Sequence, residues 1–278
     1  EGRSTLVGRK GEATVFFSDI ANFTTMSELL DPDVLSNLMN RYLTPMANII
    51  MHRTGYVDKF HGDAVMAVWG VPYPMKDHAV QACLAALEQM ECLKKLSPEL
   101  AAKYGHEINV RIGINTGIVT AGNMGSELRF QYTVMGDAVN QASRLEDANK
   151  IYGTRILIGE ATYLRARDYI EVRCMGQIRV KGKVQPVKIY ELLARRSELD
   201  PAMRDVVNWY EDALGLCWQR EWDKSAQKIE KALQVRPDDG PSHFLLNRVR
   251  YFKSNPPPPE WQNVIQMQLN IEDDREAS

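Results

Sequence analysis

Residues 55–70 read GYVDKFHGDAVMAVWG, with two short apolar runs rich in β-formers on either side of a His-Gly-Asp turn. Glycine supplies the backbone freedom that such a tight turn needs, and the flanking residues favour extended backbone. The stretch therefore predicts a pair of adjacent strands, with Asp63 in the turn that joins them.

The segments around this hairpin supply the other elements of a small sheet. Residues 12–20, EATVFFSDI, form an apolar run that predicts a buried strand. A helix capped by Asp31 and closed by Gly55 is expected next, and a second helix over 77–96. Residues 108–117, INVRIGINTG, alternate as in a strand with one buried face. The order strand, helix, strand, strand, helix, strand is the ferredoxin-like βαββαβ arrangement of an α+β domain.

The second half of the chain changes character. Residues 132–146, YTVMGDAVNQASRLE, predict a helix that begins just after a Met-Gly-Asp turn. Short segments rich in β-formers follow at 155–159, 168–175 and 186–193. From Pro201 there are two helical patterns around a short link, and four residues are spaced as in a tetratricopeptide unit: Trp209, Ile229, Ala232 and Pro237. The sequence therefore predicts one domain over 1–196 and a helical appendage with a proline-rich tail over 197–278.

Composition limits the classes of protein to which the chain can belong. Its 278 residues are 44% hydrophobic and 25% charged, as expected for one or two folded globular domains. With 34 basic and 36 acidic side chains there is no overall positive field to recruit nucleic acid, so an anionic ligand would be held by a few local cations. The four cysteines lie far apart, which argues against a zinc site or disulfide framework and favours a reducing, cytoplasmic setting.

No run approaches the roughly 20 apolar residues that a membrane-spanning helix needs, so we expect the fragment itself to be soluble. The chain opens at Glu1 rather than at a methionine, from which we expect a longer parent protein. A sensor domain, with or without an anchor on the cytoplasmic face of a membrane, is the expected occupant of the upstream part.

Two aspartates are candidates for metal binding. Asp19 ends the first predicted strand and Asp63 lies in the hairpin turn, so neighbouring strands would open both carboxylates onto one edge of the sheet. Two such groups repel each other unless a divalent cation neutralises them, and magnesium is the natural candidate. The alternative is that Asp19 is a helix or turn cap and Asp63 an ordinary turn residue.

A second polar pair lies on the helix after the Met-Gly-Asp turn. Asn140 and Arg144 are four positions apart, so both face the same way and could reach one ligand. The alternative has Asn140 bonding within its own helix and Arg144 pairing on the surface with Glu146 or Asp147.

Four segments in this order, FFSDI, KFHGDAVMAVWG, YTVMGDAVNQASRLE and RVKGK, resemble the catalytic domain of class III nucleotidyl cyclases, the adenylate and guanylate cyclases. The resemblance covers residues 10–195. It implies that Asp19 and Asp63 hold two divalent cations, Mg²⁺ or Mn²⁺, with the backbone carbonyl of Ile20 as a further ligand. It also implies the reaction, in which the ribose 3′ hydroxyl attacks the α-phosphate and pyrophosphate leaves.

The same resemblance gives roles to the polar pair on the helix. Asn140 would orient the ribose. Arg144 would place positive charge on the α-phosphate as the transition state forms.

The choice of base follows from hydrogen-bond chemistry. Adenine presents an acceptor at N1 and a donor at N6, so its pocket needs a donor and an acceptor, whereas guanine presents the reverse. Lys59 is a donor and the Thr133 hydroxyl can accept, which favours ATP as the substrate. Guanylate cyclases carry glutamate and cysteine at the corresponding positions. Thr133 instead matches a threonine-bearing subclass of adenylate cyclases, some of whose members respond to bicarbonate.

Lys181, in a Lys-Gly-Lys turn, resembles the triphosphate contact of the family, although such a turn is often simply solvated. Some members carry arginine where this chain has Ile118. Phosphate binding then falls to Arg111, to the lysines or to the metal ions, and the sequence does not choose between them.

Sites of this family are built across a dimer face, with metal ligands from one subunit and base, ribose and transition-state residues from the other. Because this chain carries both sets, a two-fold homodimer with two identical sites is expected. Other classes stay open: a guanylate cyclase, a polymerase or diguanylate cyclase with a two-metal palm fold, a noncatalytic nucleotide-binding regulatory domain, or an interaction scaffold. The lack of a GGDEF-like segment and the presence of both residue sets favour adenylate cyclase.

Overall fold

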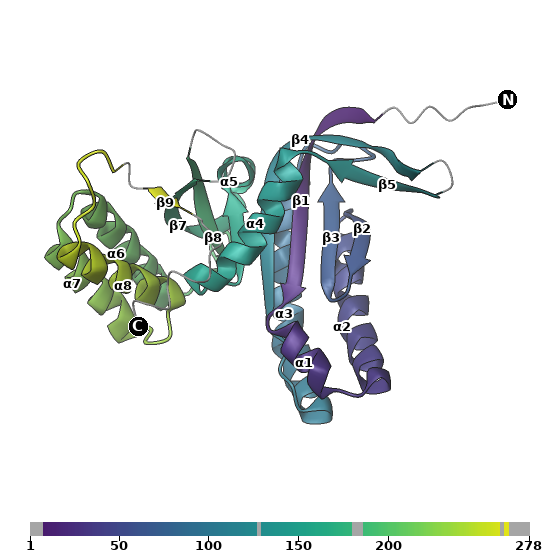
Figure 1. Ribbon diagram of the computed structural model, residues 1–278, viewed down its shortest axis with the longest axis horizontal. Coiled ribbons are helices and arrows are strands. Elements are labelled where there is room, and N and C mark those ends of the chain that lie inside the picture. Colours follow the sequence, from purple (N-terminus) through teal and green to yellow (C-terminus); the bar gives the residue numbers. More distant parts are fainter. Residues whose placement is uncertain (1–7, 127–128, 180–185, 262–263, 267–278) are drawn as a thin grey trace.

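The computed structural model describes residues 8–126, 129–179, 186–261 and 264–266 (Figure 1). The strands in these residues are β1 (Arg9–Ile20), β2 (Tyr56–His61), β3 (Ala64–Trp69), β4 (Val110–Ser126), β5 (Arg129–Met135), β6 (Ile156–Gly159), β7 (Ile170–Arg179), β8 (Val187–Arg195) and β9 (Val264–Gln266). The helices are α1 (Phe23–Leu29), α2 (Pro32–His52), α3 (His78–Tyr104), α4 (Asp137–Tyr152), α5 (Glu160–Ala166), α6 (Pro201–Trp218), α7 (Trp222–Val235) and α8 (Gly240–Ser254). Each helix in this part of the chain is too short or too polar to cross a lipid bilayer.

The nine described strands form one sheet in the order β2-β3-β1-β4-β6-β8-β7-β9, with β5 paired to β4. In its first half, β1 lies between β3 and β4 and is antiparallel to both, so that Phe16 is opposite Ala67 on one side and Ile114 on the other. Helices α1 and α2 connect β1 to β2, and α3 connects β3 to β4. This is the ferredoxin-like βαββαβ arrangement, and the predicted fold class is confirmed.

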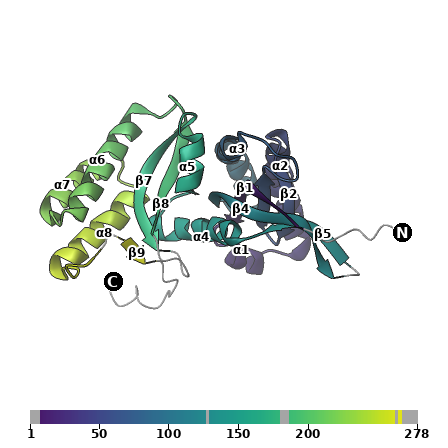
Figure 2. The same ribbon diagram turned by 90° about the horizontal axis from the view of Figure 1, so that it is seen from above.

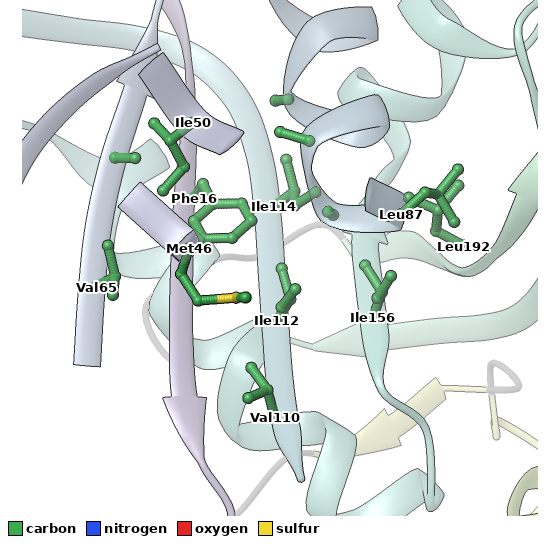
Figure 3. Close-up of a cluster of buried hydrophobic side chains, with 14 of the residues drawn as sticks. Phe16, Met46, Ile50, Val65, Leu87, Val110, Ile112, Ile114, Ile156 and Leu192 are labelled. Atoms are coloured by element: carbon green, nitrogen blue, oxygen red, sulfur yellow. The ribbon is translucent and has the colours of Figure 1, made fainter. Parts of the chain in front are cut away.

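Helices cover both faces of this half of the sheet. Figure 2 shows α2 and α3 on one side of β1 and β4, and α4 on the other. On the first face, Phe16 and Ile112 are fully buried in one cluster with Met46 and Ile50 of α2 (Figure 3). Burying each such side chain contributes roughly 1.5–3 kcal/mol to folding. The inward alternation expected over 108–117 is confirmed, since the four apolar side chains concerned are no more than 2% exposed, but α4 covers the other face too, where Asn115 is 4% exposed.

The ends of α2 differ in detail from the expectation. Asp31 occupies the N-cap position, but its side chain accepts no capping hydrogen bond. At the other end Thr54, rather than Gly55, takes the left-handed conformation, with φ of 60°. A Cβ on Gly55 would lie 2.5 Å from the Trp69 ring, so glycine is required there by the close approach of β3.

Helix α3 is longer than expected. It continues to Tyr104, and Pro98 is accommodated inside it. The predicted end near Leu96 is wrong because Leu100, in the next turn, still packs in the core at 1% exposure.

The C-terminal part contains three helices rather than two helical patterns, and they pack against the second half of the sheet (Figure 1). The third helix, α8, begins where Asp239 accepts a hydrogen bond from the backbone N–H of Ser242 at 3.1 Å. One buried cluster joins α6, α7 and α8 to β8 and α4, and it includes Leu145, Tyr152, Ile189, Tyr210, Ile229 and Leu245.

A buried arginine ties these helices to the sheet. The Arg173 side chain on β7 is 1% exposed, and its guanidinium donates to Glu191 of β8 at 2.9 and 2.5 Å. It also donates to both carboxylate oxygens of Asp239, at 2.8 and 3.0 Å, and lies 4.9 Å from the centre of the Tyr210 ring. Two carboxylates from separate parts of the chain are thus held by one cation.

Replacing Arg173 with methionine keeps apolar contact with Tyr210 but leaves two buried carboxylates without a cation. We expect the free energy of unfolding, measured by chemical denaturation, to fall by about 3–5 kcal/mol. The matched control is Arg250→Met on the exposed side of α8, which should change it by less than about 0.5 kcal/mol. Equal stability of the two variants would contradict this account of the network.

Candidate active site

The paired carboxylates lie where β1 stops and the β2–β3 hairpin turns. Because β1 and β3 are antiparallel neighbours, with Ser18 opposite Val65, the end of one strand meets the start of the other. The backbone N–H of Ile20 donates to Asp63 Oδ2 at 2.9 Å, and the Asp63 carboxylate is close enough to Asp19 to raise the pKa of that side chain. The structure therefore brings together the three residues that the sequence assigned to a metal site.

The electrostatics of this pair favour a bound cation. Burial, with a hydrogen bond and charge repulsion from Asp63, raises the pKa of Asp19 to about 7, and Arg111 partly opposes the rise. A divalent cation would relieve the repulsion, and carboxylates with a backbone carbonyl are the hard oxygen donors that Mg²⁺ or Mn²⁺ prefers. Across the described ranges there is no group of three or more His, Cys, Asp or Glu side chains arranged for a metal ion. The two carboxylates Asp19 and Asp63, with the Ile20 carbonyl beside them, are the oxygen donors that this end of the sheet offers to a cation.

Glu146 belongs to this cluster, although the sequence suggested it as a surface partner of Arg144. It is 8% exposed, and its Oε1 lies 3.5 Å from Nε of Arg111, the residue opposite Asp19 in the sheet. Burial, with repulsion from Asp19, raises the pKa of Glu146 to about 8. Arg111, one candidate for phosphate binding, thus faces protein carboxylates. The spacing of Ala142 and Glu146 on one helix face was the available signal for this burial.

Helix α4 lies directly on β4. A Cβ on Gly113 would be 2.2 Å from the carbonyl oxygen of Ala142 and equally close to the amide nitrogen of Glu146, so only glycine permits this approach. The contact sets the position of the helix that carries Asn140 and Arg144.

Asn140 and Arg144 have different surroundings. Asn140 is exposed, whereas Arg144 is half-buried and lines a cavity of about 410 Å³ between α4, β4, the start of α5 and β8. Other lining residues include Asn115 and Glu160. Ile118 also lines it and is 62% exposed, so it supplies an apolar wall rather than a charge.

Lys59 of β2 and Thr133 of β5 meet in a polar cluster with Asp58. Lys59 Nζ lies 3.2 Å from Thr133 Oγ1 and 3.1 Å from Asp58 Oδ2. The Thr133 hydroxyl donates to the same carboxylate oxygen at 3.0 Å. Because a carboxylate only accepts, the hydroxyl proton is directed to Asp58 and the threonine oxygen is left as an acceptor.

Asp58 was not assigned to the site from the sequence, and the reason is local geometry. Successive side chains on a strand normally point to opposite faces. The pairing of β2 with β3 shifts register between Val57 and Lys59. Such a bulge allows the side chains of both Asp58 and Lys59 to reach Thr133.

Three further residues near the predicted site have different surroundings. Lys181, the expected triphosphate contact, lies outside the described residues. Tyr132 packs edge-on against Tyr56, with ring centroids 5.8 Å apart. Phe130 is 49% exposed and lies at the surface of β5.

Known proteins resemble most of the chain. The family model described as "Adenylate and Guanylate cyclase catalytic domain" matches residues 6–194. Adenylate cyclase 1 of Rhizobium meliloti is 37% identical over 182 residues, and the match covers 66% of this chain but 27% of that protein. The crystal structure of the adenylyl cyclase CyaB from P. aeruginosa is 39% identical, with a TM-score of 0.64, over 70% of this chain and 100% of that one. The structure of the guanylyl cyclase Cya2 is 31% identical, with a TM-score of 0.63, over 70% and 98% respectively.

The carboxylate cluster predicts how stability depends on pH. In metal-free protein, the pKa values of Asp19 and Glu146, about 7 and about 8, exceed their ordinary values of 3.8 and 4.5. At these two groups the folded protein therefore binds more protons than the unfolded chain across this range. Their contribution to the free energy of unfolding should fall as pH rises from about 4 to about 8, measured by chemical denaturation with a chelator present.

The variant Asp63→Asn tests the cause. It removes the charge beside Asp19 but not its burial, so the decline of stability with pH should become shallower. Asp33→Asn, on the exposed first turn of α2, is the matched control and should leave the slope unchanged. An unaltered slope in Asp63→Asn would show that the two carboxylates do not interact.

Proposed function

The chain belongs to the class III nucleotidyl cyclases, the family of adenylate and guanylate cyclase catalytic domains, and on this basis we propose that it converts ATP to 3′,5′-cyclic AMP and pyrophosphate. The observation that carries the proposal is the pair of converging carboxylates, Asp19 and Asp63, whose repulsion a cation would relieve. Residues 1–196 would form the catalytic domain and 197–278 the helical appendage.

In the proposed reaction each polar group has one task. Asp19, Asp63 and the carbonyl of Ile20 would hold two divalent cations. When bound, these ions lower the pKa of the ribose 3′ hydroxyl and neutralise the triphosphate. Asn140 would orient the ribose so that the 3′ oxygen faces the α-phosphate in line with the departing pyrophosphate. Arg144 would stabilise the negative charge that builds on the α-phosphate.

The choice of ATP over GTP rests on the cluster of Lys59, Thr133 and Asp58. The lysine ammonium can donate to adenine N1. The threonine oxygen, whose own proton goes to Asp58, can accept from the adenine amino group. Guanine presents the opposite pattern, a donor at N1 and an acceptor at O6. Its N1–H would therefore face the lysine ammonium, which is also a donor. Lys181 would add a contact to the triphosphate.

Complete sites would form in a homodimer, with the carboxylates of one protomer facing Asn140 and Arg144 of its partner. Support comes from apolar side chains exposed on β4 and β5, which extend beyond the rest of the sheet (Figure 1). Ile118, Phe130 and Met135 are 62%, 49% and 58% exposed. Side chains of this kind typically become buried in an interface. A two-fold contact would repeat every pairing and give two identical sites.

The relative from Rhizobium meliloti is much longer than the matched part. We propose that the catalytic domain is likewise part of a larger cytoplasmic signalling protein, with an upstream sensor that is either soluble or anchored to the membrane.

Exchange of the base-reading residues should change the preferred nucleotide. In Lys59→Glu combined with Thr133→Cys, kcat/KM for ATP should fall at least about 100-fold, while activity on GTP relative to ATP rises. Purified protein is assayed with each nucleotide, in magnesium and then in manganese. The control Lys76→Glu makes the same charge change at an exposed position. A wild-type protein that prefers GTP would overturn the assignment and favour a guanylate cyclase.

Shared sites predict complementation between inactive variants. Asp63→Ala and Asn140→Ala should each be nearly inactive, whereas an equimolar mixture should recover roughly a quarter of wild-type activity, because half the dimers carry one intact site. A mixture of Asp63→Ala with Asp19→Ala, which damage the same half of the site, is the control and should stay inactive. Lack of recovery in the first mixture would contradict sites shared between protomers.

A further inference from the structure

The C-terminal half of α4 is packed against the appendage. Leu145 and Tyr152 of α4 belong to the same hydrophobic cluster as Leu245 of α8. The centre of the Tyr152 ring lies 4.7 Å from that of Phe244, also on α8. Leu145 directly follows Arg144. The helix that carries Asn140 and Arg144 is therefore packed, next to Arg144 itself, against residues of α8 about 100 positions later in the chain.

The backbones themselves come close together where α4 ends and α8 begins. Gly153 is the C-cap residue of α4, and Gly240 is the first residue of α8. A Cβ on Gly240 would lie 2.5 Å from the carbonyl oxygen of Gly153 and 2.9 Å from its Cα. Backbone atoms have no rotamer through which to move away, so one added methyl group would push the two helices apart.

The start of α8 is itself fixed to the sheet. Asp239, its N-cap residue, accepts hydrogen bonds from Ser242 within the helix and from Arg173 on β7. Arg173 is held in turn by Glu191. Because this end of α8 is bonded from two directions, a wedge between the helices would displace α4 rather than α8 alone.

Helix α4 can transmit such a displacement. It has 16 residues, so it is about 24 Å long and moves as a rod. Its contacts with β4 include Gly113 against Ala142 and Glu146 in the middle of the helix, and Asn149 nearer its end, whose amide donates to the carbonyl of Ile112 at 2.9 Å. A shift at Gly153 would tilt the helix about these contacts and move Asn140, on the other side of them.

We propose that the helices of the appendage, α6 to α8 (residues 201–254), act as a positioning element for catalysis. Through Gly240 and Phe244 they hold α4 at the angle at which Asn140 and Arg144 meet the nucleotide. The inference rests on the proposed cyclase function and deepens it. Gly240 and Phe244 are positioning residues, and the appendage has a task in turnover rather than serving only as a scaffold.

The test compares two glycine substitutions in the appendage of the full chain. Gly240→Ala inserts the wedge, whereas Gly215→Ala in α6 adds a Cβ with no atom within 4 Å. Gly240→Ala should lower kcat roughly 10- to 100-fold, the effect of misplacing catalytic groups by about 1 Å. Its KM for ATP should change less than about twofold, since Lys59 and Thr133 lie on other elements. Gly215→Ala should leave both constants unchanged.

Mixing assays then locate the defect within the site. Gly240→Ala keeps its carboxylates but has a displaced α4. Its mixture with Asp63→Ala should therefore recover as much activity as Asp63→Ala mixed with Asn140→Ala. Its mixture with Asn140→Ala should stay roughly tenfold lower. A general loss of folding or dimerisation would lower both mixtures equally.

Activity of Gly240→Ala equal to that of Gly215→Ala, or equal recovery in its two mixtures, would overturn the inference. If Gly240→Ala does not fold, Phe244→Leu takes its place, because it removes the ring contact without adding atoms, and the same asymmetry between mixtures is expected.

The proposed shared sites are tested separately from the role of the appendage. Failure of Asp63→Ala to complement Asn140→Ala would overturn the shared sites. In that event the kcat values of Gly240→Ala and Gly215→Ala would still decide whether the appendage positions α4.

Discussion

The direct contact of α4 with β4 at Gly113 is the constraint on which the polar groups of this protein depend. Because no side chain separates helix from strand, Ala142 and Glu146 lie immediately over the sheet. Glu146 is thereby brought to Arg111 on the same strand, and the opposite side of the helix is left to present Asn140. A larger residue at position 113 would push the helix away from the strand. It would then separate Glu146 from Arg111 and displace Asn140.

The two polar clusters have opposite electrostatic character. Around Asp19, three acidic side chains gather near one guanidinium, and their repulsion is expressed in the raised pKa values of Asp19 and Glu146. Lys59, Asp58 and Thr133 instead satisfy one another, with one positive and one negative group and a hydroxyl between them. The first cluster therefore gains most from an added cation, whereas the charges of the second already balance each other.

Much of the fold could be predicted because it follows from the types and spacing of residues that are close together in the sequence. The apolar run at 12–20 and the hairpin at 55–70 each follow from residue type, and they place Asp19 and Asp63 at strand ends that meet. Features that depend on tertiary contact were not predictable in the same way. Asp58 reaches Thr133 only because a bulge interrupts the alternation of β2. Gly55 is required by the Trp69 ring, which lies in another element.

The burial of Glu146 and the presence of a third C-terminal helix also depend on tertiary contacts, so the sequence did not predict them. A glutamate on an amphipathic helix is usually solvated, and only the approach at Gly113 shows that this one is covered. The short link before α8 contains the cap at Asp239, but that aspartate gains its importance from Arg173, 66 positions away in the chain. Neither the contact of Gly113 with Glu146 nor that of Arg173 with Asp239 can be read from a short stretch of sequence.

The Arg173 network explains how an appendage can hold a helix at a defined angle. Apolar packing is nondirectional, so the cluster that joins α4, α6 and α8 would by itself tolerate some sliding. A guanidinium that donates to two carboxylates requires both to lie in its plane at hydrogen-bond distance. Glu191 fixes the arginine to the sheet and Asp239 fixes the start of α8 to the arginine. The direction of α8 is therefore set by hydrogen-bond geometry rather than by burial alone. The same geometry sets the position of Gly240, against which Gly153 at the end of α4 packs.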